Sequence, residues 1–453
     1  MSQYWWRIDE PTSLLGTWWI WKKKRNMIPG ELVYTPGKGL ELRRNSNFVD
    51  HESLRDLFRA FSEPSEAYTI HGVVGGNTPV TLKECFPSRE AIVVNAAFIG
   101  IHCNPIRPPR VNSLVIKLSN LEAWLGGIKT EGDLTDKLRL EVRPGKLEKS
   151  VEGTLHALNA HLEIQHGVHS RYEASGVQLS HQAEIRFKFN SLVAFDVAQR
   201  AANLTMQLLA LLIGKPTTLT LEWYRFENDA AVSHLAPSWV RLAPRKLHPA
   251  EILCSMKTIQ SDFVELLDRW IERAKRLETP RSLLHAVLMK SATFLDSEVT
   301  ELMQAIEGYC NETDSFAYLS DEQFANVLSK INSASEGTTA DFVDRVANSA
   351  KWFNRPSLRS HLKRLLSRID PDVAKNIVGR VGIPKFVGQC VVARNKIAHP
   401  QSGSIWEDHE LDDVMELISR LKLLLVTCML LDAGMTVETI RAKYRDHRRW
   451  QWG

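Results

Sequence analysis

The sequence predicts a multidomain α+β protein, in which a β-rich N-terminal domain precedes an all-α helical bundle. The chain has 453 residues, which suggests two or three domains. Its first half carries short apolar runs punctuated by Gly, Pro and Asn, a pattern that is typical of strands. After about residue 250 the apolar positions recur near the 3.6-residue period of a helix.

The composition is that of an ordinary globular protein. Apolar residues make up 44% of the chain and charged residues 24%. These values exclude a mostly disordered chain, a collagen and a coiled-coil rod. The formal net charge of +4 is too small to indicate a class of partner, so local charge carries more information.

The N-terminal strands are expected to form a sandwich or an open, barrel-like sheet. Residues 31–35 and 39–43 flank the turn Pro36-Gly37-Lys38, which predicts a hairpin. A helix over residues 191–213 ends at Gly214, a typical stop signal. The other predicted strands are 16–21, 68–74, 79–85, 92–102, 113–118, 138–142, 151–164, 177–189 and 217–226.

The second half is predicted to be helical. Its breaks fall at Asp370-Pro371 and at Gly382-Ile383-Pro384. The expected helices are 251–277, 281–310, 321–332, 340–353, 357–369, 384–398, 408–431 and 436–450. We therefore predict a β-rich domain over residues 1–245, a connecting helical region over 246–280 and a helical bundle over 281–453.

The sequence favours a cytoplasmic protein that does not enter a membrane. No apolar signal segment follows the N-terminus, and the longest apolar runs, 208–213 and 423–431, fall short of the ~20 residues of a membrane helix. The six cysteines are scattered without a Cys-x-x-Cys pair, which is typical of reduced cytosol. Neither a metal-binding signature nor a cofactor motif is present, so we expect no metal and no cofactor.

The residues with the clearest chemical potential lie in the segment 386–400, FVGQCVVARNKIAHP. Asn395 and His399 are four apart and share a helix face, while Pro400 should end the helix. Arg394 can hold phosphate oxygens bidentately, and His399 can move a proton near neutral pH. Alternatively the three polar residues simply cap the helix, because Arg-x4-His is a frequent chance pattern.

Local positive charge surrounds this segment. Residues 351–400 contain 11 Lys and Arg against 2 Asp and Glu, a net charge of +9 that attracts phosphates. The alternative is a solvated basic helix face. Candidate RNA-binding residues are Lys385 and Lys396 in this segment, and Arg448 and Arg449 in a tail that mixes cations with aromatics.

The segment around Arg394 and His399 resembles the Arg-x4–6-His signature of the HEPN superfamily, in which a polar residue, here Asn395, usually follows the arginine. Near the N-terminus, GTWWI at 16–20, PGELVY at 29–34 and GLEL at 39–42 are similar to the N-terminal domain of ApeA-type proteins. IHG at 70–72 and VTL at 80–82 extend the similarity. The two resemblances occur in the order found in ApeA-type proteins.

The resemblance implies a HEPN endoribonuclease effector of bacterial anti-phage defence, acting by abortive infection without a metal. Arg394 would bind the phosphate, His399 would act as acid or base, and Asn395 would orient the site. An acidic residue on the first long helix, Glu301 or Glu307, would face the arginine. The implied partners are an RNA substrate, for example a tRNA, and a phage-encoded trigger protein. The chain would form a homodimer or a higher even oligomer, with residues 1–245 as a domain that senses a trigger or restrains the nuclease.

Two other functions stay open on the sequence alone. One is a non-catalytic HEPN-like module that binds RNA or protein; the other is a ligand-binding β-sandwich with a helical oligomerisation domain. His161, His166 and His169 are predicted to be surface or cross-strand histidines rather than metal ligands. Cys390 is predicted to be buried in the core rather than nucleophilic.

Overall fold

The chain divides into two compact units, Met1–Glu272 and Arg273–Gly453. Strands dominate the first unit and helices the second, which confirms the predicted fold class. The computed structural model describes residues 6–21, 27–44, 68–88, 91–107, 109–126, 130–134, 140–144, 151–173, 176–236, 247–248, 251–289, 294–314, 316–335, 339–350, 352–399 and 405–446.

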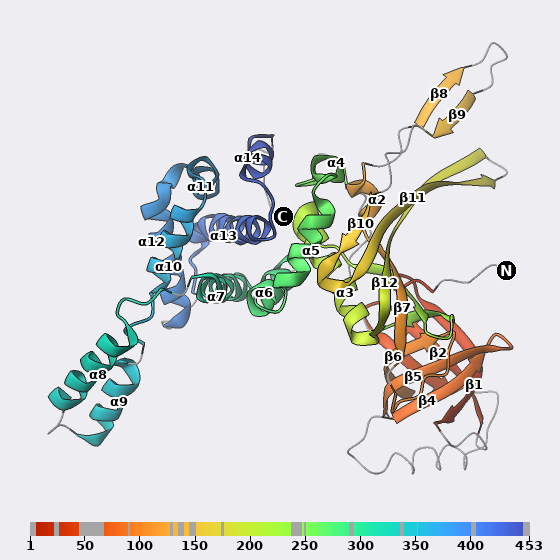
Figure 1. The fold of residues 1–453 in the computed structure, drawn as a ribbon, viewed down its shortest axis with the longest axis horizontal. Coiled ribbons are helices and arrows are strands. Elements are labelled where there is room, and N and C mark those ends of the chain that lie inside the picture. Colours follow the sequence, from red (N-terminus) through yellow and green to blue (C-terminus); the bar gives the residue numbers. More distant parts are fainter. Residues whose placement is uncertain are drawn as a thin grey trace. The chain divides into compact units, whose positions relative to one another are not determined.

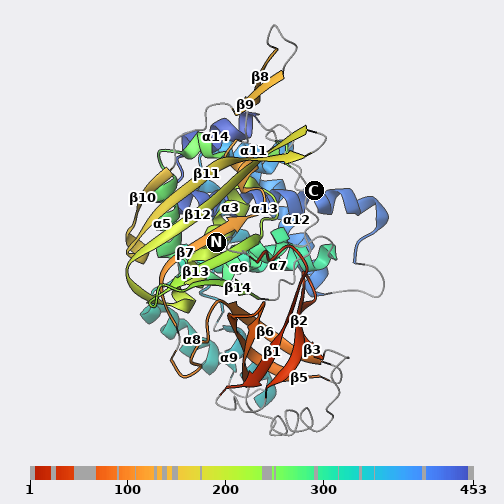
Figure 2. The ribbon, with the colours of Figure 1, turned by 90° about the vertical axis from the view of Figure 1, so that its right-hand side faces the viewer.

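The first unit contains one large antiparallel sheet and a separate hairpin, β8–β9 (Figures 1 and 2). Its strands are β1 Thr12–Ile20, β2 Ile28–Thr35, β3 Gly39–Arg44, β4 Tyr68–Val74, β5 Thr78–Pro87, β6 Ala91–Ile99, β7 Arg110–Leu118, β8 Thr130–Leu134, β9 Leu140–Pro144, β10 Val151–Leu155, β11 Ala160–Glu173, β12 Gly176–Ala194, β13 Leu219–Phe226 and β14 Ala231–Leu235. Its helices are α2 Leu121–Trp124, α3 Phe195–Ile213, α4 Met256–Ile259 and α5 Phe263–Arg273, which reaches into the second unit by one residue.

Strands β1 to β6 close into a barrel. The order β6-β3-β2-β1-β4-β5 returns to its start because β5 also pairs with β6. The remaining strands, β10-β11-β12-β7-β13-β14, continue from β6 as an open sheet. The predicted hairpin at Pro36-Gly37-Lys38 joins β2 to β3. The sequence left the choice between sandwich and open barrel undecided, whereas the structure combines a closed barrel with an open sheet.

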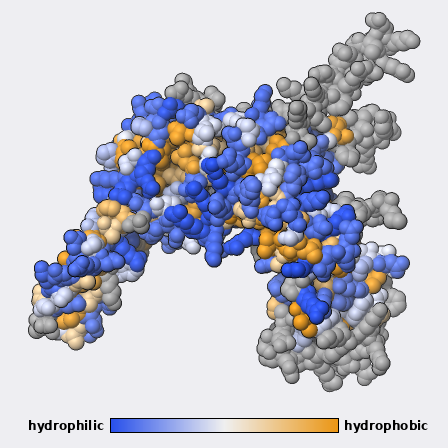
Figure 3. All heavy atoms as spheres, in the orientation of Figure 1, coloured by the Kyte–Doolittle hydropathy of each residue, from blue (hydrophilic) through white to orange (hydrophobic). Residues whose placement is uncertain are grey.

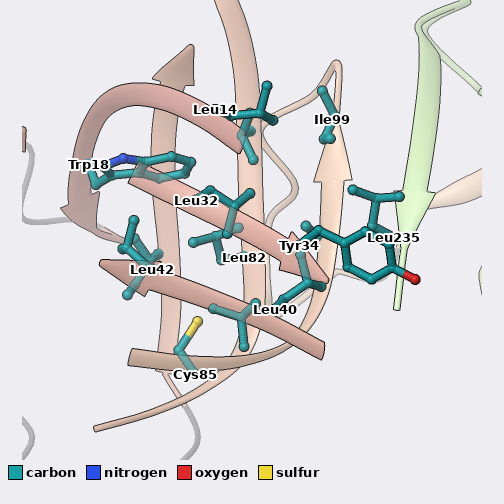
Figure 4. Close-up of a cluster of buried hydrophobic side chains, with 14 of the residues drawn as sticks. Leu14, Trp18, Leu32, Tyr34, Leu40, Leu42, Leu82, Cys85, Ile99 and Leu235 are labelled. Carbon is teal, nitrogen blue, oxygen red and sulfur yellow. The ribbon is translucent and has the colours of Figure 1, made fainter. Parts of the chain in front are cut away.

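The barrel encloses a core of large apolar side chains from every one of its strands (Figure 4). Alternating residues of β2, such as Leu32 and Tyr34, point inward, as the two-residue period of a strand requires. Buried polar atoms are satisfied within the core: the Trp18 Nε1–H donates to the Gly30 carbonyl at 3.1 Å, and the Tyr34 hydroxyl donates to the Ile8 carbonyl at 2.6 Å. The core therefore fixes the register of the first strands.

Gly72→Ala is expected to destabilise the barrel. A Cβ atom on Gly72 would lie 2.1 Å from Cε3 of the buried Trp18 ring. Overpacking of this kind costs about 1–3 kcal/mol, which outweighs the ~0.4–1 kcal/mol that a Gly→Ala change gains through the unfolded chain. Urea unfolding should show a lower midpoint for Gly72→Ala. The control is Gly167→Ala on β11, where the added carbon meets nothing within 4 Å. Equal midpoints for Gly72→Ala and the wild type would contradict this packing.

Helix α3 packs against β7 and β12 of the open sheet. Its end at Gly214, in the left-handed conformation with φ 74°, is where the sequence placed it. Its start at Phe195 is four residues later than predicted because β12 continues to Ala194. Trp270 on α5 donates from Nε1 to the Leu204 carbonyl at 2.9 Å, so α5 packs onto α3.

The second unit is a helical bundle. Its helices are α6 Glu278–Met289, α7 Leu295–Thr313, α8 Asp321–Ser335, α9 Ala340–Ala350, α10 Leu358–Arg368, α11 Pro371–Val378, α12 Gly382–Ala398, α13 Leu411–Asp432 and α14 Val437–Asp446. The single helices predicted over 251–277 and 281–310 were wrong: each is divided in two, into α4 and α5 and into α6 and α7. Helices α10, α12 and α13 all contact α7, which therefore forms the centre of the bundle.

Helices α8 and α9 form a hairpin in which each mainly contacts the other. Ala350 at the end of α9 is buried, whereas Val327 and Phe342 remain 38% and 52% exposed. Apolar side chains therefore reach the surface of this hairpin, as Figure 3 shows at the lower left. Among the described helices, none combines the length and the apolar composition needed to cross a bilayer.

Candidate functional site

Helix α12 carries the Arg-x4-His segment and is anchored by one apolar face. Phe386, Val387, Cys390 and Ala393 are buried, at the i, i+1, i+4, i+7 spacing of a core-facing helix stripe. Burial raises the pKa of the Cys390 thiol to about 12, so it stays protonated and unreactive near neutral pH. The prediction that Cys390 packs in the core is confirmed.

The helix ends where the sequence predicted. His399 follows the last helical residue, Ala398, with φ −132° and ψ 65°. Its backbone N–H still donates to the Asn395 carbonyl at 3.0 Å. This hydrogen bond holds the backbone of His399 beside the last turn of the helix. Pro400, which predicted this end, lies outside the described residues.

The three predicted site residues are brought together on this last turn. Arg394, Asn395 and His399 are all exposed. At ~3.6 residues per turn, Asn395 and His399 lie about 40° apart around the axis, and Arg394 lies about 100° from Asn395. A guanidinium, an amide and an imidazole therefore face solvent together, where a large anionic substrate can reach all three.

Glu307 on α7 lies within electrostatic range of Arg394. Burial raises the pKa of the Glu307 carboxyl, and the positive charge of Arg394 partly offsets this rise. Glu307 and Glu301 were both predicted as partners for the arginine. Helical spacing could not choose between them; α12 packs on α7, and the charge of Arg394 lowers the pKa of Glu307 against the effect of burial.

The two predicted RNA-binding lysines of α12 differ in position: Lys396 lies on the last turn, and Lys385 lies near the start of the helix. Lys396 forms an ion pair with Glu410, and its ammonium lies 5.6 Å from the ring centroid of Trp406. Lys385 is exposed, but it precedes Arg394 by nine residues and so lies about 180° around the helix from it. Arg448 and Arg449 lie outside the described residues, as does most of the tail.

A second stripe on α12, exposed at three of its four positions and half-buried at Gly388, was not predicted from the sequence. Gly388, Val392, Asn395 and His399 follow one another at i, i+4, i+7, i+11. Val392 is 57% exposed, and a Cβ on Gly388 would meet nothing within 4 Å. The heptad-like spacing of these residues in the sequence could have predicted the stripe. The stripe joins a small and an apolar position to two of the site residues.

Two of the three N-terminal histidines make contacts with a neighbouring strand. His161 lies 4.0 Å from a carboxylate oxygen of Glu152 on the neighbouring strand, and His166 contacts His181 across β11 and β12 at 3.4 Å. These two are cross-strand histidines, as predicted; the side chain of His169 lies outside the described residues. Within the described ranges, no three or more His, Cys, Asp or Glu side chains are grouped so as to hold a metal ion.

Comparison with known families covers both units. Residues 13–270 match the family described as ApeA N-terminal domain 1, and residues 300–439, which include Arg394 and His399, match Apea-like HEPN. Neither the curated proteins nor the solved structures include a match to this chain. The first match alone spans more than half of the 453 residues. The chain therefore belongs to the ApeA family, with an ApeA N-terminal domain followed by an ApeA-like HEPN domain, and is a HEPN effector of anti-phage defence.

Proposed function

We propose that the chain is a metal-independent endoribonuclease whose active site is built from Arg394, Asn395 and His399. The observation that carries this proposal is the joint exposure of these three side chains on the last turn of α12. The HEPN match supplies the expected substrate class, RNA. The test is cleavage of RNA by the purified chain, compared with an Arg394→Ala variant. RNA that is bound but never cut would favour the alternative, a non-catalytic binding module.

The reaction proposed for this site is an intramolecular transesterification of the RNA backbone. The 2′-hydroxyl attacks the adjacent phosphorus and loses its proton to a base, and the bond to the 5′-oxygen breaks as that oxygen gains a proton. The product carries a 2′,3′-cyclic phosphate, which water then opens. His399 can perform one of the two proton transfers, and a second group must perform the other. Arg394 neutralises the charge that develops on the phosphate oxygens.

We propose that this second group is the His399 imidazole of another copy, so that the chain acts as a homodimer or a higher even oligomer. The stripe Gly388, Val392, Asn395, His399 offers a self-complementary surface, because the small and apolar positions allow two copies of α12 to approach closely. In such a pair the two His399 side chains would lie on either side of one cleft. The N-terminal unit is proposed to sense a phage-encoded trigger.

Glu307→Gln is expected to reduce RNA cleavage by about tenfold, an effect typical of losing a group that orients a catalytic side chain. The change removes the negative charge beside Arg394 and frees the guanidinium to adopt other positions. The comparison is Glu301→Gln on the same helix, which should retain wild-type activity. Rates at saturating RNA should fall while the thermal midpoint stays constant. Equal cleavage rates for Glu307→Gln and the wild type would show that Glu307 does not act in the site.

A further inference from the structure

An exposed cluster of aromatic and basic side chains lies where the α8–α9 hairpin joins the bundle. We name this the aromatic–basic patch: Phe316, Tyr318, Trp352, Phe353, Arg355 and Arg364. Tyr318, Trp352 and Phe353 are 52%, 60% and 62% exposed. Large aromatic rings exposed to this extent forgo the free energy of burial, so an unusual concentration of them indicates a binding surface.

Cations are stacked on two of these rings. The Arg355 guanidinium lies 4.4 Å from the ring centroid of Trp352, and that of Arg364 lies 4.0 Å from the ring centroid of Phe316. Tyr318 meets Phe316 edge to face, with the centroids 5.2 Å apart. Alternating rings and guanidinium planes provide the stacking platform and the charge that single-stranded nucleic acids require.

The two loops that carry the patch are held together, so the surface is formed before any ligand arrives. The Leu319 N–H donates to Oδ1 of Asn354 at 2.7 Å, and Nδ2 of Asn354 donates to the Leu319 carbonyl at 3.0 Å. The hydroxyls of Tyr318 and Ser360 are hydrogen-bonded at 2.7 Å. A preformed surface loses less conformational entropy when it binds.

The charge of the residues around the patch indicates the class of ligand. Residues 352–368 contain five Lys and Arg and no Asp or Glu, which suits a phosphate backbone. By contrast, the hairpin segment 321–350 contains five Asp and Glu against two Lys and Arg, although apolar side chains are exposed there too. Exposed rings and an excess of cations thus coincide in the patch and not along the hairpin.

The patch and the candidate active site are linked through one helix. Arg364 pairs with Asp314 at the end of α7 at 2.7 and 2.9 Å, and Arg394 interacts with Glu307 on the same helix. Positions 307 and 314 are two turns apart on one helix face, about 10 Å along the axis. A strand lying on the patch can therefore continue toward Arg394.

We propose that the aromatic–basic patch binds single-stranded RNA by stacking bases on Trp352 and its neighbouring rings. It holds the strand so that the following phosphates reach Arg394. The binding half of this proposal stands by itself, and the positioning half rests on the nuclease function proposed above.

The test measures RNA binding by the full-length chain, in a His399→Ala background that prevents cleavage. The probe is an unstructured, fluorescently labelled RNA of about 16 nucleotides, the upper end of the lengths that single-strand-binding folds cover. Trp352→Ala combined with Phe353→Ala is expected to weaken binding by about tenfold or more, the loss typical of removing base stacking. Phe342→Ala, an equally exposed aromatic on α9, should bind as tightly as the parent. A base-paired duplex should not distinguish the variants, because its bases are hidden.

Each outcome decides the proposal separately from the nuclease assignment. If the double variant binds RNA as tightly as its parent, or if the parent binds no RNA, the patch is not an RNA site, whatever the cleavage assay shows. If the double variant loses a protein partner but keeps RNA, the patch is a protein-docking surface and the proposal is wrong. If RNA binding depends on the patch but wild-type chains cut no RNA, the assignment of the patch as an RNA site is supported and the proposed nuclease function is contradicted. Arg355→Lys, which keeps the charge but not the planar stack, should weaken binding as well.

Discussion

His399→Ala is expected to abolish RNA cleavage while leaving the fold and RNA binding intact. The imidazole is exposed at the end of α12, so its removal creates no cavity in the core. Loss of one general acid–base group lowers a rate by about 10²–10⁴-fold. Arg394→Ala should cause a loss of similar size, because the charge developing on the phosphate then has no fixed counter-charge. Cleavage is followed on a labelled RNA, with product ends checked for a 2′,3′-cyclic phosphate.

The matched control is His409→Ala, which removes another highly exposed histidine of the same unit and should leave the rate unchanged. Wild-type activity should also persist in EDTA, since Arg394 and His399 supply the proposed chemistry without a Lewis acid. Activity that disappears on chelation and returns with Mg²⁺ would contradict this mechanism. Activity retained by His399→Ala would contradict the assignment of the histidine.

Val392→Arg is expected to convert the oligomer into monomers and to remove cleavage together with assembly. Val392 is 57% exposed at the centre of the α12 stripe, and an arginine there would place like charges opposite each other across a two-fold axis. Light scattering gives the mass of the particle, and the RNA assay gives its activity. Met415→Arg on α13 changes an apolar side chain outside the stripe that is 48% exposed, and it should alter neither the mass nor the activity.

Mixing subunits tests the same interface without disrupting it. If each site needs two intact histidines, an equal mixture of wild-type and His399→Ala chains leaves about one quarter of the dimers fully active. Simple dilution would leave half of the activity. A wild-type chain that is strictly monomeric and fully active would refute the shared site.

The parts of the fold that could be predicted are those set by neighbours in the sequence. Phe386, Val387, Cys390 and Ala393 define the buried face of α12, and Pro400 marks its end. The site residues on the last turn could therefore be placed from the sequence alone. The hairpin at Pro36-Gly37-Lys38 could also be predicted, because a tight turn is determined by its own residues.

Features that depend on contacts between distant segments were not predictable in this way. The barrel closes because β5 pairs with β6 as well as with β4, and no local pattern specifies that second pairing. The proposal of Glu307 as the partner of Arg394 rests on the packing of α12 on α7. The aromatic–basic patch joins residues near 317 to residues near 354, which a hydrogen-bonded asparagine brings together.

The order of the barrel strands along the chain has a consequence for synthesis on the ribosome. Every pairing that closes the barrel lies between residues 12 and 99. Arg394 emerges almost 300 residues later, which at about 5–20 residues per second corresponds to about 15–60 s. The N-terminal barrel can thus be complete while the HEPN domain is still being translated. A nascent chain of this kind completes its barrel before it carries the residues of the proposed nuclease site.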